Sequence, residues 1–376
     1  MKFKGLLFLV MLVLGLSFYQ LVLAQRYEPE IPFAPRHYIC FRTQFPLTVD
    51  GKLDEVSWQK VPWSDNFMDI EGPSKPIPTY RTRIKMLWDD QYLYIAARLE
   101  EPNIWATLKQ RDTVIFHDND FEVFIDPDGD THHYYEFEMN ALNTIWDLML
   151  TKPYRNGGTY INAWDIRGAR TAVNIEGTLN DPSDTDNSWT VELAFPWKVL
   201  AQTAPGRKRP KDGDQWRINF SRVEWKTRME NGKRVKQKAP KTGKVLPENN
   251  WVWSPQGLIN MHYPEMWGYV QFSDQTANKP SSVPFIHHPD EKVKWALRLL
   301  YYRERSYVSK HGSYTDDLSQ LDFDRIKQRV FGSDASNSNK FKPQIESTHS
   351  MFEIRTPSIE DQGVWHIRQD SKIWKN

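Results

Sequence analysis

The sequence predicts an all-β fold, an antiparallel β-sandwich of jelly-roll type followed by a small C-terminal appendage of one helix and a hairpin. Three observations predict it. Aromatic residues make up 14% of the chain, with 16 Trp, 16 Tyr and 19 Phe. Short segments of alternating apolar and polar residues are separated by turns rich in Asp, Gly and Pro. Cys40 is the only cysteine, so the chain cannot form an internal disulfide and must be stabilised by its core.

The N-terminus has the pattern of a secretory signal peptide over residues 1–24. Two lysines precede an apolar segment from residue 6 to residue 18, and the small residue Ala24 precedes the polar Gln25. This order is typical of a segment that is cleaved, here after Ala24. An uncleaved membrane anchor is the alternative. We therefore expect a secreted, periplasmic or cell-surface protein of a bacterium, with no membrane span after cleavage.

The remainder of the chain is predicted to have four parts. Residues 25–40 are irregular and contain three prolines, so they are interpreted as a leader segment. Residues 41–273 carry the strand pattern and are interpreted as the sandwich. Residues 274–289 are polar and contain proline, as expected of a linker, and residues 290–376 form the appendage.

The sandwich is predicted from strands and the turns between them. The segment 83–87 is followed by a polar turn and by 92–99, which together predict a hairpin. A second hairpin joins 121–125 to 133–140 across Asp126-Pro127-Asp128-Gly129-Asp130. Many short strands without helices between them favour two packed sheets. The other expected strands are 171–175, 188–195, 215–224 and 266–272.

The appendage is predicted to begin with a helix at Asp290. Apolar residues recur there every three to four positions, and Gly312 stands where a helix commonly ends. Two strand-like segments, 351–355 and 363–368, follow near the C-terminus. A protein partner, where one exists, is expected at this appendage.

The charge balance argues against nucleic acid as a partner. The chain has 49 Lys and Arg against 48 Asp and Glu, a formal net charge of +1, and no long basic segment. Binding to a phosphate backbone requires a basic surface, which this composition does not supply.

Seven separated motifs lie between residues 41 and 273. They are Val49-Asp50-Gly51-Lys52-Leu53-Asp54-Glu55 with Trp58, Leu87-Trp88-Asp89-Asp90, the segment 118–126, the segment 137–140, Trp189-Thr190-Val191-Glu192 with Phe195-Pro196-Trp197, the segment 213–220, and Trp253-Ser254-Pro255 with Trp267-Gly268. These motifs resemble those of family 9 carbohydrate-binding modules, in the order of that family. The resemblance implies a DOMON-like sandwich that binds plant-type polysaccharide or oligosaccharide without cleaving it, as a module associated with glycosidases.

The resemblance also implies where a sugar would bind. In the family, two aromatic side chains on separate loops clamp the sugar. The first position corresponds to Phe116, with Trp105 as a nearby substitute, and the second falls at Met261-His262-Tyr263, a loop without tryptophan. Glu122 keeps the place of the family's acidic residue, whereas Glu138 stands where the family has an arginine.

The residues themselves supply the chemistry that sugar recognition requires. Flat rings cover the apolar side of a sugar, and carboxylate, amide or guanidinium groups bind its hydroxyls. Glu122 alternates with Phe121 and Val123, so it points away from the core. The candidate carbohydrate-binding residues are Phe116, Glu122, Trp105, Trp146, Glu138, Arg222, Trp253 and His262.

Several of these candidates have a structural alternative. Glu122 and Glu138 could be carboxylates satisfied by neighbouring groups, and for Glu138 this alternative is favoured. Arg222 could bind a pair of hydroxyls or pair with a carboxylate, and the sequence leaves both open. Trp105, Trp146 and Trp253 lie next to loop residues and are predicted at the surface.

No cofactor is expected, with calcium as the one possibility left open. Asp126, Asp128 and Asp130 are spaced two apart, which makes them weak calcium candidates. A hairpin turn built from Asp and Gly is the favoured interpretation of the same residues.

Three other functions remain open. Glu122 with Glu138 or Asp120 could serve a glycoside hydrolase, which requires two carboxyl groups flanking the substrate. Met149, Met261 and His262 could bind haem, as happens in related sandwich domains. A structural envelope protein without a ligand is the third alternative.

Overall fold

The computed structural model describes residues 27–277 and 283–376, and the predicted signal peptide lies outside the described residues. The chain divides into two compact units. The first unit is Glu30–His287, and the second joins His288–Asn376 to the N-terminal segment that ends at Pro29. Each unit is described by itself.

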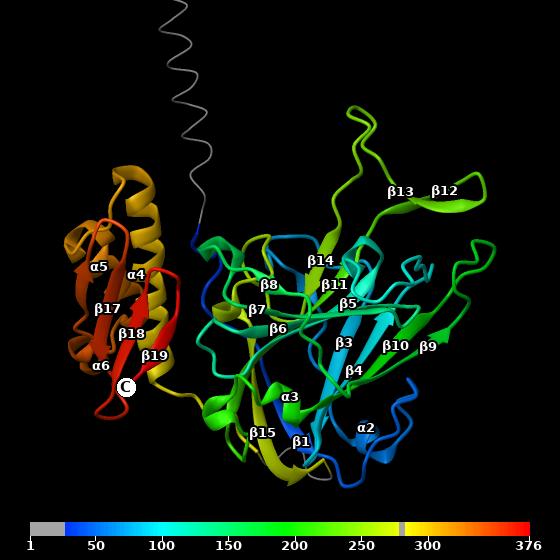
Figure 1. Ribbon diagram of the computed structural model, residues 1–376, viewed down its shortest axis with the longest axis horizontal. Helices are drawn as coiled ribbons and strands as arrows, with labels where there is room; N and C mark the ends of the chain where they lie inside the picture. Colours follow the sequence, from blue (N-terminus) through cyan, green and yellow to red (C-terminus); the bar gives the residue numbers. More distant parts are fainter. Residues whose placement is uncertain (1–26, 278–282) are drawn as a thin grey trace, which may run out of the picture. The chain divides into compact units, whose positions relative to one another are not determined.

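The first unit is built on one hydrogen-bonded sheet of 13 strands (Figure 1). Its order is β8-β7-β6-β5-β11-β15-β1-β3-β4-β10-β9, and β14 and β2 extend it beside β11. All pairs are antiparallel except those of β1, which runs parallel to both β15 and β3. The strands are β1 (His37–Arg42), β2 (Met68–Asp69), β3 (Thr82–Trp88), β4 (Tyr92–Glu100), β5 (Asp120–Asp126), β6 (Tyr134–Asn140), β7 (Ile145–Leu150), β8 (Tyr160–Ile161), β9 (Arg170–Glu176), β10 (Ser188–Pro196), β11 (Gln215–Glu224), β14 (Asn249–Val252) and β15 (Gly268–Thr276).

Short elements complete this unit. The helices α2 (Val56–Lys60) and α3 (Trp197–Leu200) are each about one turn long. A separate two-stranded hairpin, β12 (Thr227–Glu230) with β13 (Lys233–Lys236), projects between β11 and β14 (Figure 1).

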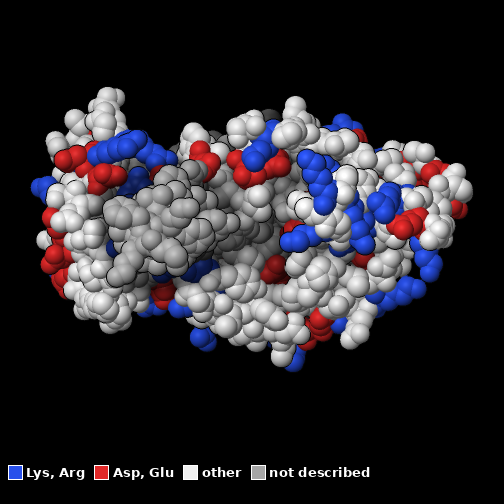
Figure 2. All heavy atoms as spheres, turned by 90° about the horizontal axis from the view of Figure 1, so that it is seen from above, with Lys and Arg blue, Asp and Glu red and all other residues white. Residues whose placement is uncertain are grey.

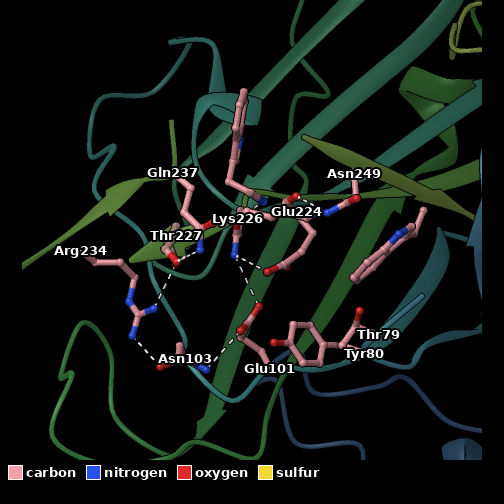
Figure 3. Close-up of a pocket in the computed structure, with 13 residues that line it drawn as sticks. Thr79, Tyr80, Glu101, Asn103, Glu224, Lys226, Thr227, Arg234, Gln237 and Asn249 are labelled. Atoms are coloured by element: carbon pink, nitrogen blue, oxygen red, sulfur yellow. Dashed lines mark hydrogen bonds between the residues drawn. The ribbon is translucent and has the colours of Figure 1, made fainter. Parts of the chain in front are cut away.

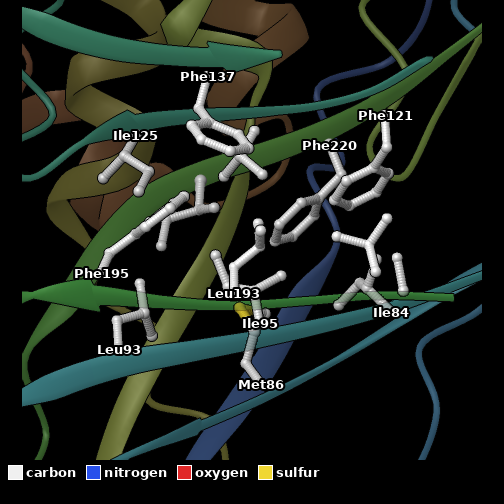
Figure 4. Close-up of a cluster of buried hydrophobic side chains, with 14 of the residues drawn as sticks. Ile84, Met86, Leu93, Ile95, Phe121, Ile125, Phe137, Leu193, Phe195 and Phe220 are labelled. Carbon is white, nitrogen blue, oxygen red and sulfur yellow. The ribbon is translucent and has the colours of Figure 1, made fainter. Parts of the chain in front are cut away.

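The sheet folds back on itself to enclose the core, as a sandwich requires. Phe137 on β6 packs edge to face against Phe195 on β10, with ring centroids 5.0 Å apart, although these strands belong to opposite halves of the strand order. Figure 4 shows side chains of β3, β4 and β10 facing those of β5, β6 and β11. Burying one such aromatic or aliphatic side chain contributes about 1.5–3 kcal/mol. The predicted antiparallel β-sandwich is confirmed.

Seven of the eight strands predicted for the sandwich agree with the structure to within one residue at each end. The exception is β15, which begins at Gly268 because residues 264–266 form a 3₁₀ turn. Strand β1 begins at His37, inside the segment interpreted as an irregular leader. This strand is held by β15, more than 200 residues later, so its own sequence carries little information about it.

The second unit contains more structure than one helix and a hairpin. The predicted helix is present as α4 (Asp290–His311), and it ends at Gly312 with a φ of 80°. Two further helices follow, α5 (Phe323–Phe331) and α6 (Ala335–Lys340). A four-stranded antiparallel sheet then contains, in order, β16 (Gln344–Ser347), β17 (Phe352–Pro357), β18 (Val364–Arg368) and β19 (Ile373–Lys375).

One buried carboxylate ties α4 to this sheet. Asp290 accepts hydrogen bonds from the Ser358 hydroxyl at 2.7 Å, from the backbone N–H of Ile359 at 2.8 Å and from the Trp365 indole at 2.7 Å, and it pairs with Lys375 at 3.0 Å. Burial alone would raise the pKa of Asp290, but these donors lower it to about 2. The carboxylate is therefore held in its charged form.

Charged side chains of both signs are exposed on the face drawn in Figure 2. Figure 2 shows lysines and arginines lying among aspartates and glutamates on the face seen from above. Within residues 27–277 and 283–376, none of the helices has the length and apolar composition that a membrane span would need.

Candidate functional site

The outer face of strands β5 and β6 carries four carboxyl groups, named here the acidic face: Asp120, Glu122, Glu136 and Glu138. Alternation along β5 places Phe121 and Val123 in the core, so Asp120 and Glu122 point to the opposite side. The antiparallel register sets Glu122 directly opposite Glu138. The same row continues to Trp146 on β7 and to Ser221 on β11.

Burial and the charge of Glu122 favour the protonated forms of Asp120, Glu136 and Glu138. All four side chains are at most 6% exposed. Burial, followed by the charge of Glu122, raises the pKa values of Asp120, Glu136 and Glu138 well above their usual range. Burial also raises the pKa of Glu122 to about 7. A carboxyl group that keeps its proton can both donate and accept a hydrogen bond, as a sugar hydroxyl does.

Aromatic side chains from three loops surround the acidic face. We name Phe116, Tyr154, Tyr160 and His262 the aromatic rim. The backbone N–H of Phe116 donates to Glu138 at 2.9 Å, and the Phe116 side chain is half-buried. Tyr154 and Tyr160 are 42% and 50% exposed. After burial, the charge of Glu136 is the next cause that raises the pKa of Tyr154, which places this tyrosine near the acidic side chains.

His262 holds part of the aromatic rim together. Its ring lies 4.5 Å from the Tyr154 ring, and its Nδ1 is 3.0 Å from the Tyr134 hydroxyl. Burial and the neighbouring Arg155 lower the pKa of His262 to about 3, so the imidazole is neutral. It can therefore offer a neutral polar group and a flat ring at this edge.

Five of the eight predicted residues converge on this one face: Phe116, Glu122, Glu138, Trp146 and His262. Glu122 occupies the row predicted from its alternation. Trp146, predicted at the surface, is only 8% exposed, because its indole N–H donates to Asn162 at 2.6 Å and its ring packs against Tyr160. Trp146 therefore lines the site, but little of its ring is accessible to a ligand.

The other two tryptophans predicted at the surface are also buried. Trp253 is 1% exposed and packs in the core, 5.9 Å from Phe220, and a Cβ added at Gly268 would meet its ring at 2.2 Å. Trp105 is 9% exposed. The loop around it is fixed by Asp186, which accepts from Ile104 N–H, and by Asn180, which accepts from Ala106 N–H, and this turns the side chain inward.

Arg222 is sealed in an ion-pair network. It is 1% exposed and donates to Glu101 at 2.7 Å and to Glu224 at 2.8 Å. It also donates to the Glu100 carbonyl at 2.8 Å. Of the two alternatives that the sequence left open, the structure has the carboxylate pairing, and no donor of this side chain is exposed to bind a sugar.

Three groups of acidic residues have oxygens close enough to hold a cation, within the part of the chain that the structure describes. In the predicted calcium loop, Asp126 already accepts from the backbone N–H groups of Gly129 at 3.1 Å and Thr131 at 2.9 Å. These hydrogen bonds hold the loop in the conformation of a hairpin turn. In the group Asp112, Asp147 and Asp165, Arg111 supplies the positive charge. The third group is Asp120, Glu122 and Glu138.

The carboxyl groups of the acidic face lie side by side on one face of the sheet. One oxygen each of Asp120, Glu122 and Glu138 lies within 4.8 Å of the others. Catalysis needs two carboxyl groups about 5–5.5 Å apart for retention or about 6.5–9.5 Å apart for inversion, on opposite sides of the substrate. The three groups here are instead neighbours on one side of a sheet.

The residues considered for haem lie on different faces of the sheet. Met149 packs against the core inside the sandwich, whereas Met261 packs on the outer face with Phe124 and Trp267. A haem held between Met149 and either Met261 or His262 would have to cross the sheet.

Sequence reasoning missed Tyr154 and Tyr160. They flank a turn, since Tyr154 opens a 3₁₀ turn capped by Gly157, and Tyr160 begins β8. Two tyrosines on either side of Gly157-Gly158 were the available signal, because aromatic residues at a turn tend to remain accessible.

A family profile described as "Carbohydrate family 9 binding domain-like" matches residues 49–243, just over half of the 376 residues. Exoglucanase XynX of Acetivibrio thermocellus is 26% identical over 152 residues, which are 40% of this chain and 12% of that protein. Endo-1,4-beta-xylanase A of Thermoanaerobacterium saccharolyticum is 28% identical over 153 residues, 40% of this chain and 11% of that protein. The match thus spans about a tenth of the length of these curated relatives.

Solved structures are also similar to this chain. A putative carbohydrate-binding protein from Bacteroides uniformis has a TM-score of 0.46 and 15% identity, and the match covers 64% of this chain and 100% of that one. A carbohydrate-binding module of family 9 from Caldicellulosiruptor kristjanssonii, in complex with glucose, has a TM-score of 0.40 and 16% identity, with 64% and 97% covered.

Proposed function

The chain belongs to the carbohydrate family 9 binding domain-like family, and from this premise we propose that its first unit binds carbohydrate and does not cleave it. The observation that carries the proposal is the row of Glu122, Glu138 and Trp146 beside the half-exposed rings of the aromatic rim. A ring can cover the apolar side of a sugar while a protonated carboxyl group exchanges hydrogen bonds with its hydroxyls. The proposed ligand is a plant-type polysaccharide or oligosaccharide.

The proposed binding residues are those that combine access with suitable chemistry. Tyr154 and Tyr160 offer exposed rings, and Phe116 and His262 offer half-buried ones. Glu122 and Glu138 lie beneath them as hydrogen-bonding groups. Trp105, Arg222 and Trp253 are not included, because their side chains are enclosed by the protein.

The arrangement of the carboxyl groups on one side of the sheet supports binding without cleavage. A glycosidase acts through one ionised and one protonated carboxyl group placed on opposite sides of the sugar. On the acidic face, Asp120, Glu122 and Glu138 each have an oxygen within 4.8 Å of the others, are buried on one side of the sheet, and have raised pKa values. They can hold hydroxyls but do not flank a bond.

Binding and cleavage can be separated in one assay. The protein is mixed with insoluble xylan and cellulose and, separately, with their soluble oligosaccharides. We expect the protein to be depleted from solution by at least one polysaccharide and no reducing ends to be released. Release of reducing ends that disappears in Glu122→Gln would indicate a hydrolase instead.

We also propose that the chain is exported and that residues 41–273 work as the binding domain, with residues 290–376 as an appendage that could receive a protein partner. Export is supported by the signal-like sequence of residues 1–24. The N-terminal sequence of the protein recovered outside the cytoplasm should begin at Gln25. An intact Met1 in that material would contradict cleavage.

A further inference from the structure

A second pocket lies at one end of the sandwich and shares no lining residue with the acidic face. We name it the end pocket. It has a volume of about 260 Å³ and lies between the ends of β4 and β11 and the β12–β13 hairpin (Figure 3). The side chains that matter for its chemistry are Tyr80, Asn103, Trp225, Arg234, Gln237 and Asn249.

The floor of the end pocket is rigid. Asn119 donates to Glu224 at 3.1 Å and approaches Glu101 at 3.4 Å, and both glutamates are held by the buried Arg222. The Trp251 ring lies 5.3 Å from the Arg222 guanidinium. These contacts fix the pocket before any ligand arrives, which lowers the entropy cost of binding.

The walls carry polar groups with unused hydrogen-bonding capacity. Gln237 donates its amide N–H to the Thr227 carbonyl at 2.7 Å, and Asn249 donates to the Glu224 carbonyl at 3.1 Å, so each bond uses the amide nitrogen and neither uses the amide oxygen. Arg234 donates to the Thr227 hydroxyl and to Asn103. Among the described residues, the Tyr80 hydroxyl makes no hydrogen bond.

The polar and charged groups of the end pocket together favour a ligand without charge. An anion would meet the amide oxygens of Gln237 and Asn249 and the carboxylates of the floor. A cation would meet Arg234 and Lys226, which both line the pocket. A neutral hydroxyl group suits both, because it donates to the oxygens and accepts from the guanidinium.

Aromatic rings complete the pocket. Trp225 is fixed by its indole N–H, which donates to the Phe116 carbonyl at 2.8 Å, and by the Lys236 ammonium, which lies 3.2 Å from the centroid of one face of the ring. The Tyr80 ring packs edge to face with Trp251, with centroids 6.2 Å apart. Rings of this kind cover the apolar side of a sugar.

We propose that the end pocket binds a single neutral sugar unit, as a site additional to the acidic face. The volume of about 260 Å³ is slightly below the range of about 300–1,000 Å³ typical of drug-sized ligands, as expected for one ring. Two sites on one unit would strengthen the attachment to a polymer by avidity.

The test uses saturation-transfer NMR on the chain from Gln25 with glucose, xylose and galactose as probes. The background is a Tyr154→Ala/Tyr160→Ala protein, which lacks the two exposed rings of the aromatic rim. We expect saturation transfer to at least one of these sugars to persist in that background. We expect at least a tenfold loss of affinity when Gln237→Leu is added, and a smaller loss with Tyr80→Phe, which removes only a hydroxyl. Gln328→Leu, an exposed glutamine of α5, is the matched control and should change nothing.

The two proposals fail in different ways. Oligosaccharide binding that is unaffected by the rim variant would count against the acidic face and leave the end pocket standing. No transfer to any of the three sugars, a tenfold preference for glucuronic acid over glucose, or affinities equal in Gln237→Leu and Gln328→Leu would overturn the end pocket.

Discussion

Two sites in this molecule bury carboxyl groups with opposite results. On the acidic face, four carboxyl groups lie side by side and burial raises their pKa values. In the second unit, Asp290 is equally enclosed, yet four donors surround it and its pKa falls to about 2. Burial alone therefore does not decide the charge of a carboxyl group, because the number of hydrogen-bond donors around the group also shifts its pKa. A buried carboxylate that is surrounded by hydrogen-bond donors stabilises the fold. A buried carboxyl group that lacks such donors can still form hydrogen bonds with a ligand.

The largest effect is expected from removing the charge of Asp290, whose carboxylate accepts from four donors. Asp290→Asn leaves Lys375 paired only with Asp361 and weakens the charge-assisted bonds from Ser358 and Trp365, so the free energy of unfolding of the second unit should fall by about 3 kcal/mol. Hydrogen exchange of α4 and β18 amides would report the loss locally. Asp316→Asn, an exposed aspartate of the same unit, is the control. Equal exchange in the two variants would contradict the structural role of Asp290.

The second effect is a pH dependence of opposite sign at the two sites. The pKa of Glu122 is raised to about 7 from its usual 4.5, so the folded state holds this proton more tightly than the unfolded state. Its stabilising contribution is complete below about pH 4.5 and is lost as the pH rises through 7, a decrease of about 2 kcal/mol between pH 5 and pH 7. Asp290 behaves in the opposite way, since its contribution is present above about pH 4 and is lost as the pH falls toward 2.

Urea unfolding at several pH values, with β5 and β6 followed by hydrogen exchange, measures this dependence. In Glu122→Gln the loss of stability between pH 5 and pH 7 should be about 2 kcal/mol smaller than in the wild type, and the remaining loss comes from Asp120, Glu136 and Glu138, whose pKa values are also raised. Glu230→Gln, an exposed glutamate, should retain it. A wild-type stability that rises over this interval would refute the raised pKa.

The smallest effect is expected from removing one ring of the aromatic rim beside the acidic face. Tyr154→Ala should weaken binding of xylo- or cello-oligosaccharides by about 1 kcal/mol, roughly a fivefold change in Kd, through loss of ring contact. The stability of the first unit should hardly change, since Tyr154 is 42% exposed. Calorimetry measures the affinity, and Tyr307→Ala on α4 is the control. Equal affinities in the two variants would remove Tyr154 from the site.

The sequence predicted those parts of the fold that depend on local pattern. Alternation and turns placed seven strands to within a residue, and Gly312 marked the end of α4. Strand β1 was interpreted as part of a leader because its partner β15 lies more than 200 residues away. The small sheet of the second unit was underestimated because β16 and β19 are only four and three residues long.

The site could be predicted in part. Alternation correctly set Glu122 and Glu138 on the face opposite the core, and register then joined them to Trp146. Whether a tryptophan near a loop is exposed depends on how the loop packs, and for this reason the surface prediction is wrong for Trp105, Trp146 and Trp253. The pairing of Arg222 with Glu101 joins residues more than 100 positions apart, and no local pattern reveals it.

The central claim is that the rings and carboxyl groups on the outer face of β5 and β6 bind a saccharide. A glycan array probed with the chain from Gln25, and again with Phe116→Ala and Glu122→Ala, tests it most directly. We expect binding to plant-type glycans by the wild type and loss of most of that signal in both variants. Binding that is unchanged in both variants would contradict the claim.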